Sequence, residues 1–402
     1  MRRNSSRPPL PPGFGTIWVS VALDLVGFGI VLPILPLYAE DFGASPTKVG
    51  LLVASFSLMQ LIFSPIWGRL SDRIGRKPLL LFSLVGTAVG SLLTGLAGSL
   101  WLLFAARIID GISGASVSVA QASVVDLAPA DQRPRLLGML GAAFGVGFVL
   151  GPALGALAAL GDHRLPFFLA SGVAAVNALV AWRRLPETHP SESRARARED
   201  AERLSGGSGE RWFDMPGVLP LVLVAFMALV AFSAFEATFA LLGERRFELT
   251  QASTGAVFAG IGIVMVGVQG GLVHAAAKRF GEMRALQVGL MLNAAGLMVL
   301  ADAHRWPELI AALALLVVGQ GLVAPMATSL VGGRARSDRR GAVLGVQQSA
   351  GSLARVVGPA MGGFLFHHVG VSAPSWFGAG LSGLAVILVV TSRRMEQHVT
   401  VG

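Results

Sequence analysis

The chain has 402 residues, of which 53% are hydrophobic and only 14% are charged. This composition excludes a soluble globular protein, because so few charged residues could not cover the surface of a chain this long. The absence of cysteine excludes disulfides, thiolate metal sites and cysteine nucleophiles. A net charge of +9 is compatible with a nucleic-acid partner, but the positions of the basic residues argue against one.

Twelve apolar segments are each long enough to cross a membrane as a helix. We therefore predict an all-α membrane protein with twelve transmembrane helices. The predicted helices comprise residues 16–38, 48–67, 79–97, 101–121, 137–158, 165–182, 216–240, 252–273, 285–302, 307–329, 342–364 and 374–392. The first is far longer than the apolar core of a signal peptide, so we expect it to remain in the mature chain.

The basic residues gather on one side of the predicted membrane. If the loops alternate from an inside N-terminus, the inside tails and loops contain 25 of the 32 Lys and Arg residues, and the outside loops contain 5. Basic residues are typical of cytoplasmic loops. We expect both termini in the cytoplasm and the protein in the inner (plasma) membrane. The positive charge then reflects topology, and no nucleic-acid partner is expected.

The first predicted helix contains Leu23-Asp24-Leu-Val-Gly27-Phe-Gly29-Ile-Val-Leu-Pro33-Ile-Leu-Pro36. The loop after the second predicted helix reads Gly68-Arg-Leu-Ser-Asp72-Arg73-Ile-Gly75-Arg76-Lys77-Pro78. Such a basic loop can act simply as a cytoplasmic anchor. It also resembles, nearly residue for residue, the loop signature of the major facilitator superfamily of transporters.

Two further segments carry the same resemblance. Arg107-Ile-Ile-Asp110-Gly111-Ile-Ser-Gly114 looks like the fourth-helix signature of the superfamily. Gly145-Val-Gly147 through Gly151-Pro152-Ala-Leu-Gly155 looks like the fifth-helix signature of its drug:proton antiporter branch. The segment around Asp24 is similar to the first helix of tetracycline efflux pumps.

The resemblance implies that the loop is a conformational latch which stabilises the outward-open state. Asp72 is then expected near a helix N-terminus of the other half of the molecule, where the helix dipole favours a negative charge. Arg76 is expected to meet an acidic residue at the base of the fourth helix, and Asp126 has that position. The expected latch residues are Gly68, Asp72, Arg73, Gly75, Arg76 and Asp126.

A polar stretch divides the predicted helices into two groups of six. Residues 183–215 are charged and contain a Gly/Ser run, which is typical of a linker. The predicted parts are a cytoplasmic tail at 1–15, an N-terminal six-helix bundle at 16–182, the linker, a C-terminal bundle at 216–393 and a tail at 394–402. Gly151-Pro152-Ala-Leu-Gly155 recurs as Gly358-Pro359-Ala-Met-Gly362, 207 residues later. This repeat predicts two pseudo-repeated bundles with the substrate path between them.

These repeated segments predict close packing between the two bundles, of span five against eight and span eleven against two. Prolines there also permit helix bends, and direct substrate contact is the alternative. The residues expected at this packing are Gly147, Gly151, Pro152, Gly155, Gly358 and Pro359.

Charged residues inside the spans indicate where coupling takes place, because each must face a cavity or a partner. Asp24, Arg107, Asp110 and Glu236 are the candidates for proton coupling or substrate binding. Arg107 and Asp110 are three residues apart and can form an internal ion pair, or Arg107 can modulate a nearby acid, as the resemblance implies. Glu236 in apolar surroundings can exchange protons, or can extend towards Arg245 and Arg246 at the outer end.

Several other polar side chains in the spans can line a cavity. The candidates are Gln320, Gln347 and Arg355, and the alternative is hydrogen bonding between helices. Asn293 stands near the position where the tetracycline pumps carry an acidic residue, which puts tetracycline itself in doubt.

The sequence contains no nucleotide-binding glycine loop, no metal-ligand cluster and no Ser-His-Asp spacing. We expect no enzyme, no metal and no cofactor other than the proton motive force. The resemblance implies a monomer that exports small amphipathic, drug-like or tetracycline-like molecules by proton-coupled alternating access. The alternative is a proton-coupled transporter of a specific metabolite or nutrient on the same fold. A non-transporting membrane protein would require an added soluble domain or a catalytic cluster.

Overall fold

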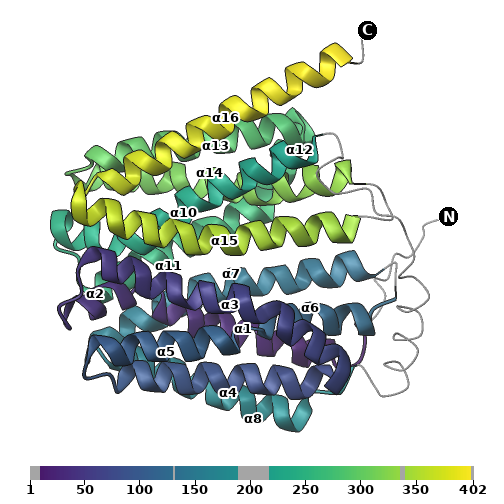
Figure 1. Ribbon diagram of the computed structural model, residues 1–402, viewed down its shortest axis with the longest axis vertical. Helices are drawn as coiled ribbons and strands as arrows, with labels where there is room; N and C mark the ends of the chain where they lie inside the picture. Colours follow the sequence, from purple (N-terminus) through teal and green to yellow (C-terminus); the bar gives the residue numbers. More distant parts are fainter. Residues whose placement is uncertain (1–9, 130–131, 189–216, 336–339, 400–402) are drawn as a thin grey trace.

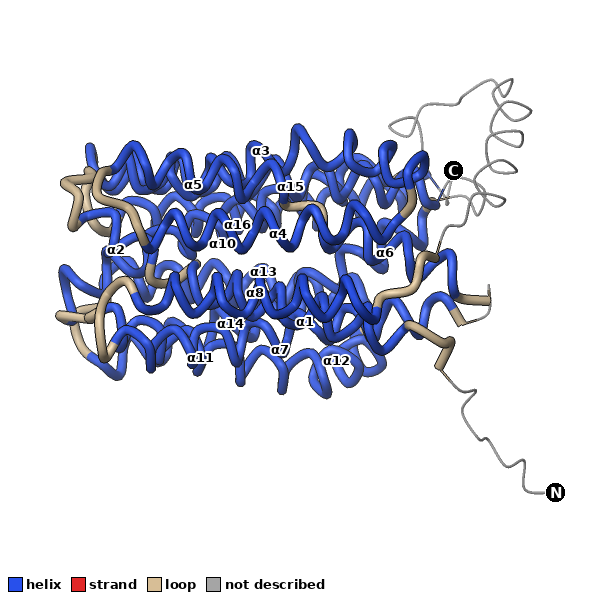
Figure 2. The backbone as a smooth tube through the Cα atoms, turned by 90° about the horizontal axis from the view of Figure 1, so that it is seen from below, coloured by secondary structure: helices blue, strands red, loops and turns tan. Residues whose placement is uncertain are grey.

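The computed structural model describes residues 10–129, 132–188, 217–335 and 340–399, so most of the predicted linker lies outside the described part. All elements of the described residues are helices, and the long ones lie side by side in one bundle (Figures 1 and 2). We call the end of the bundle where α8 ends and α10 begins the linker end. The opposite end contains α2, and we call it the α2 end (Figure 1).

The helices fall into two groups on either side of the linker. The first comprises α1 (Phe14–Val31), α2 (Leu35–Glu40), α3 (Pro46–Ile74), α4 (Arg76–Gly95), α5 (Leu100–Ser113), α6 (Ser116–Leu127), α7 (Arg133–Ala159) and α8 (Leu165–Arg184). The second comprises α10 (Val218–Phe247), α11 (Gln251–Gly267), the π-helix η2 (Val268–Leu272), α12 (Val273–Phe280), α13 (Glu282–Asp302), α14 (Trp306–Arg334), α15 (Arg340–His368) and α16 (Ala373–Val399).

Eleven helical segments of the described residues are long and apolar enough to cross a membrane. The twelfth predicted span corresponds to α15, a helix of 29 residues. Its hydropathy is lower because it contains Gln347, Gln348 and Arg355. It packs along α3 and α10 like its neighbours. The prediction of an all-α membrane fold is confirmed.

Three predicted spans cross the bundle but are not uninterrupted α-helices. Span 16–38 divides into α1 and α2, because the ring of Pro33 removes a backbone donor, and Pro36 occupies the second position of α2. Span 101–121 divides into α5 and α6 at Gly114, whose ψ of 53° is not helical. Span 252–273 passes through the π-turn η2 and continues as α12. Such interruptions are invisible to hydropathy, which reports only length and composition.

Among the described residues, one cluster of buried apolar side chains is shared between the groups, and it lies at the α2 end. At the α2 end, one cluster combines Tyr38 and Leu52 of the first group with Phe239 of the second. Towards the linker end there are two separate clusters, one containing Leu80 and the other Leu286. The two groups are therefore joined by apolar packing at the α2 end.

The repeated glycines lie against helices of their own group. A Cβ on Gly151 would be 2.7 Å from Gly29 of α1, and Gly147 and Gly155 also face α1. A Cβ on Gly358 would be 2.7 Å from the carbonyl oxygen of Val230 in α10. The predicted helix pairs are correct, since α7 packs against α11 and α15 packs against α3, but these glycines do not lie at those contacts. Glycine at every fourth residue identifies a closely packed helix face, but not the helix that this face meets.

Other small residues bring the two groups together. A Cβ on Gly255 of α11 would be 3.0 Å from the carbonyl oxygen of Pro152 in α7. A Cβ on Gly50 of α3 would collide with the carbonyl oxygen of Pro359 and lie 3.0 Å from Gly363 in α15. Pro152 and Pro359 thus lie where α7 meets α11 and where α3 meets α15, between the groups.

Candidate functional site

Away from the helix ends, the first group contains three charged residues, Asp24, Arg107 and Asp110. Arg107 of α5 donates from Nη1 to Oδ2 of Asp110 at 2.8 Å, and both side chains are buried. The Arg107 guanidinium also lies 4.4 Å from the centre of the Phe56 ring. Asp24 of α1 accepts a hydrogen bond from the Ser116 hydroxyl at 2.5 Å. Its carboxylate also interacts electrostatically with that of Asp110. The structure thus brings Asp24, Arg107 and Asp110 together.

The second group contributes Glu236 of α10 and Arg355 of α15. The two side chains interact electrostatically and both are partly exposed. Glu236 does not extend towards Arg245 and Arg246, so that alternative is wrong. Those arginines have other partners, because Arg245 pairs with Glu40 at 2.8 Å and Arg246 donates to backbone carbonyls at the end of α13.

The predicted glutamines form hydrogen bonds between helices. Gln320 of α14 is only 8% exposed and accepts from Asn293 of α13 at 3.1 Å. It therefore bridges two helices of one group, and its prediction as a cavity-lining residue is wrong. Gln347 of α15 donates to Thr328 of α14 at 3.2 Å and remains partly exposed. The contact between α13 and α14 at Asn293 and Gln320 is thus a hydrogen bond between two uncharged side chains.

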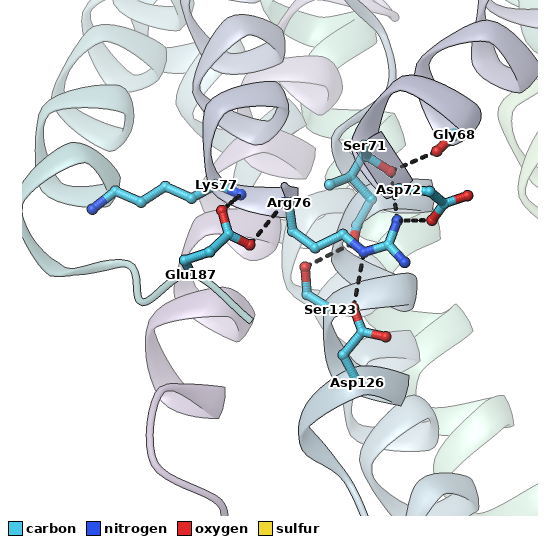
Figure 3. A network of polar contacts seen from close by, with 9 residues as sticks. Gly68, Ser71, Asp72, Arg76, Lys77, Ser123, Asp126 and Glu187 are labelled. Carbon is cyan, nitrogen blue, oxygen red and sulfur yellow. Dashed lines mark hydrogen bonds and ion pairs between the residues drawn. The ribbon is translucent and has the colours of Figure 1, made fainter. Parts of the chain in front are cut away.

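The loop between α3 and α4 is organised around one buried arginine (Figure 3). Arg76 donates from Nε to Oδ2 of Asp126 at 2.9 Å and from Nη1 to Oδ1 of Asp72 at 2.7 Å. It also donates to the Ser71 hydroxyl at 2.5 Å. Arg76 and Asp126 thus meet at the base of the fourth span. In this conformation Asp72 pairs within its own group rather than across to the other, and Arg73 lies in the last turn of α3.

Glu187, which sequence reasoning missed, binds the start of α4. Its carboxylate accepts from the backbone N–H groups of Arg76 at 2.9 Å and Lys77 at 3.2 Å (Figure 3). An acid at a helix N-terminus is stabilised by the free N–H groups and the helix dipole. Gly75 has a φ of 107° and a Cβ there would collide with this carboxylate. A Cβ on Gly68 would meet no described atom within 4 Å.

The α2 end contains polar contacts between the groups that the sequence did not indicate. Glu40 pairs with Arg245, and Thr47 lies 3.0 Å from Nδ1 of His367. Burial, together with the neighbouring Glu244, raises the pKa of Glu40 to about 7, although Arg245 opposes this. These residues lie at helix ends, where no periodic pattern marks them.

Among the residues that the structure describes, no group of three or more His, Asp or Glu side chains could hold a metal ion.

Two groups of membrane-spanning helices, with ionisable residues placed inside each, are typical of membrane transporters. The family model of the Major Facilitator Superfamily matches residues 17–276 and 272–401. The chain belongs to this family, as its sequence motifs predicted.

Its relatives cover nearly the whole chain. It is 32% identical to the tetracycline resistance protein, class E, of Escherichia coli over 382 residues, which are 92% of this chain and 93% of that protein. It is 28% identical to multidrug resistance protein 1 of Bacillus subtilis, with 92% and 93% coverage. The crystal structure of the human organic anion transporter MFSD10 (TETRAN) matches with a TM-score of 0.70 and 29% identity, covering 94% of this chain and 98% of that one.

Proposed function

We propose that this chain exports small amphipathic molecules in exchange for protons, by alternating access. The observation that carries the proposal is that each helix group contains a carboxylate away from its helix ends that is not held in a close ion pair, Asp24 and Glu236, while the described residues share an apolar core between the groups at the α2 end. Relatives named for tetracycline and multidrug resistance support drug-like cargo.

The linker end is the cytoplasmic end in this proposal. Most Lys and Arg residues belong to tails and loops at that end, as is typical of cytoplasmic loops. The N-terminal bundle (16–182) and C-terminal bundle (216–393) then act as rocking units joined by a cytoplasmic linker. With apolar packing at the α2 end, the described conformation is the one that faces the cytoplasm.

The proposed cycle uses the two carboxylates in turn. Protons entering from outside neutralise Asp24 and Glu236 and weaken the binding of cargo, which leaves. The bundles then rock, and loss of the protons to the cytoplasm restores binding. The α3–α4 loop stabilises the outward-open conformation, in which Asp72 leaves Arg76 for a helix N-terminus of the other bundle.

The test is proton movement triggered by cargo. Purified monomeric protein is placed in liposomes with an imposed pH gradient and an entrapped pH dye, and candidate drugs are added in turn. We expect drug-dependent proton flux that is lost in Asp24→Asn and Glu236→Gln. The exposed Glu248→Gln is the matched control and retains flux. Absence of flux with every hydrophobic drug and with tetracycline would reject drug export and favour a specific metabolite as cargo.

A further inference from the structure

The fourth membrane span is interrupted near its middle. The helix α5 ends at Ser113 and α6 begins at Ser116, with Gly114 in a non-helical conformation between them. A break inside a membrane frees backbone carbonyl and N–H groups that no water satisfies. Such a break persists only where neighbouring side chains provide partners.

Three side chains of α3 and α4 provide those partners. Gln60 donates to the carbonyl of Gly114 at 2.9 Å, and the Trp67 indole donates to the carbonyl of Ile112 at 2.5 Å. Ser83 donates to the carbonyl of Ser113 and accepts from the Ala115 N–H at 3.2 Å. The break is therefore a built feature of the first group and not a frayed helix end.

The break places the start of α6 against Asp24. Ser116 is the first residue of α6, and its hydroxyl donates to Oδ2 of Asp24 at 2.5 Å. The positive end of the α6 dipole therefore adjoins this carboxylate, which an uninterrupted helix would not allow. Oδ1 of Asp24 is buried and has no hydrogen-bond partner among the described residues. This is the oxygen at which a proton can add while Oδ2 keeps its bond.

The other charged residues around Asp24 are either far from it or, in the case of Asp110, carry a like charge that disfavours its ionisation. Its helix packs against α4, α6, α7 and α8. The charged residues of those four helices lie in the terminal turns at the linker end, and they are Arg76, Lys77, Asp126, Arg133, Arg135, Arg183 and Arg184. The charged side chain that acts on Asp24 is Asp110 of α5, a like charge partly compensated by Arg107. The hydroxyl of Ser116 is thus the direct stabiliser of the Asp24 charge.

We propose that Ser116, presented by the break in the fourth span, is a positioning residue that sets how readily Asp24 takes up a proton. The hydroxyl and the first turn of α6 stabilise the carboxylate, whereas the apolar surroundings and Asp110 disfavour it. A proton adds to Oδ1 and leaves from it, and no other bond changes. This inference rests on the proposed function only in taking Asp24 as a coupling carboxylate.

The test is a titration of Asp24 that needs neither cargo nor gradient. Infrared difference spectra of the full chain in lipid are recorded across the pH range, and the carboxylic-acid band that is missing in Asp24→Asn is followed. We expect Ser116→Ala to move the midpoint of this band by about one pH unit to higher pH, since a hydrogen bond to a charged group is lost. Ser116→Thr keeps the hydroxyl and restores the wild-type midpoint.

Ser118→Ala is the matched control. That hydroxyl is exposed and donates to the carbonyl of Ala115 at 2.9 Å, so the midpoint is expected to stay in place. An unchanged midpoint in Ser116→Ala, an equal shift in Ser118→Ala, or no band that depends on Asp24 would each overturn the proposal. If Ser116→Ala does not fold, Ser116→Cys gives the same comparison with a weaker donor. Because no transport is measured, failure here is separate from failure of the exporter assay.

Discussion

Asp24, Arg107, Asp110, Glu236 and Arg355 each interact with a polar or charged side chain within the spans. Arg107 is 3% exposed and pairs with Asp110 on the next turn of α5 while lying over the Phe56 ring. The pair is enclosed by protein, so neither charge is compensated by water. Removing one partner then leaves a buried charge that is far more costly than the loss of the pair as a whole.

This asymmetry predicts the stability of variants. Asp110→Asn should destabilise the folded protein by about 3 to 5 kcal/mol, because the Arg107 charge is left unpaired. The double variant Arg107→Met, Asp110→Asn should recover most of that loss. Thermal unfolding of the purified proteins, followed by tryptophan fluorescence, measures both. If the double variant unfolds no later than Asp110→Asn, the pair is not the reason for the loss.

The connection between α3 and α4 is stabilised in its conformation by Gly75 and by Glu187, which is distant in the sequence. Gly75 has a φ of 107°, a conformation that L-residues rarely adopt, and its α-carbon faces the Glu187 carboxylate. That carboxylate binds the first two N–H groups of α4, while Arg76 joins Asp72 to Asp126. The loop is therefore held from both sides, by the end of the sixth span and by the base of the fourth.

Alanine substitutions at Gly75 and Gly68 should have opposite effects on the stability of the folded protein. Gly75→Ala should destabilise the protein by about 1 to 3 kcal/mol, since the backbone is strained and the new Cβ displaces Glu187. Gly68→Ala should be neutral or stabilising by about 0.5 to 1 kcal/mol, because it lies inside α3 with free space around it. Chemical denaturation of both variants tests this. A large loss of stability in Gly68→Ala would contradict the packing described above.

At the scale of the molecule, the two groups meet through the shared apolar cluster and a few polar contacts at the α2 end. Gly50 and Gly363 allow α3 and α15 to approach, and the Glu40–Arg245 pair crosses between the groups. Glu40 is the titratable member of this contact, with its pKa raised to about 7 chiefly by burial.

The closed α2 end should therefore depend on pH in a definite direction. When the groups separate and Glu40 becomes solvated, its pKa returns towards 4.5, so the closed conformation binds the proton more tightly. Closure is favoured as the pH on that side falls through 7, and this stabilisation is complete below 4.5. It is lost as the pH rises above 7. Although Arg245 prefers the charged form, burial outweighs it.

Spin labels measure this dependence directly, because the chain has no native cysteine. Leu160→Cys and Val369→Cys place labels on exposed positions of the two groups at the α2 end. The distance between the labels should shorten as the pH is lowered through 7, and Glu40→Gln should remove the change. A distance that lengthens on acidification would show that the ion pair, and not burial, dominates.

The sequence was sufficient for the fold but not for most partners within it. Apolar length and the 68–78 loop predict the membrane helices and the family, because these depend on composition and local spacing. The neighbours of Gly147 and Gly358 depend on which helix face meets which, and no local pattern contains that information. The break at Gly114 and the electrostatic interaction of Glu236 with Arg355 arise from contacts between distant segments. No local sequence pattern marks Ser116 or Glu187. Their roles become visible only in the structure, where Ser116 contacts Asp24 and Glu187 contacts the start of α4.

The carboxylate of Glu187 also determines where the chain can be divided into two separately expressed polypeptides. A cut within residues 189–216 leaves Glu187 covalently attached to the first polypeptide, which then contains every residue needed to cap α4. A cut only a few residues earlier would give that polypeptide an uncapped helix and leave the acid on the wrong fragment. Complementation of the two fragments should therefore succeed for cuts after Glu187 and be impaired for cuts before it.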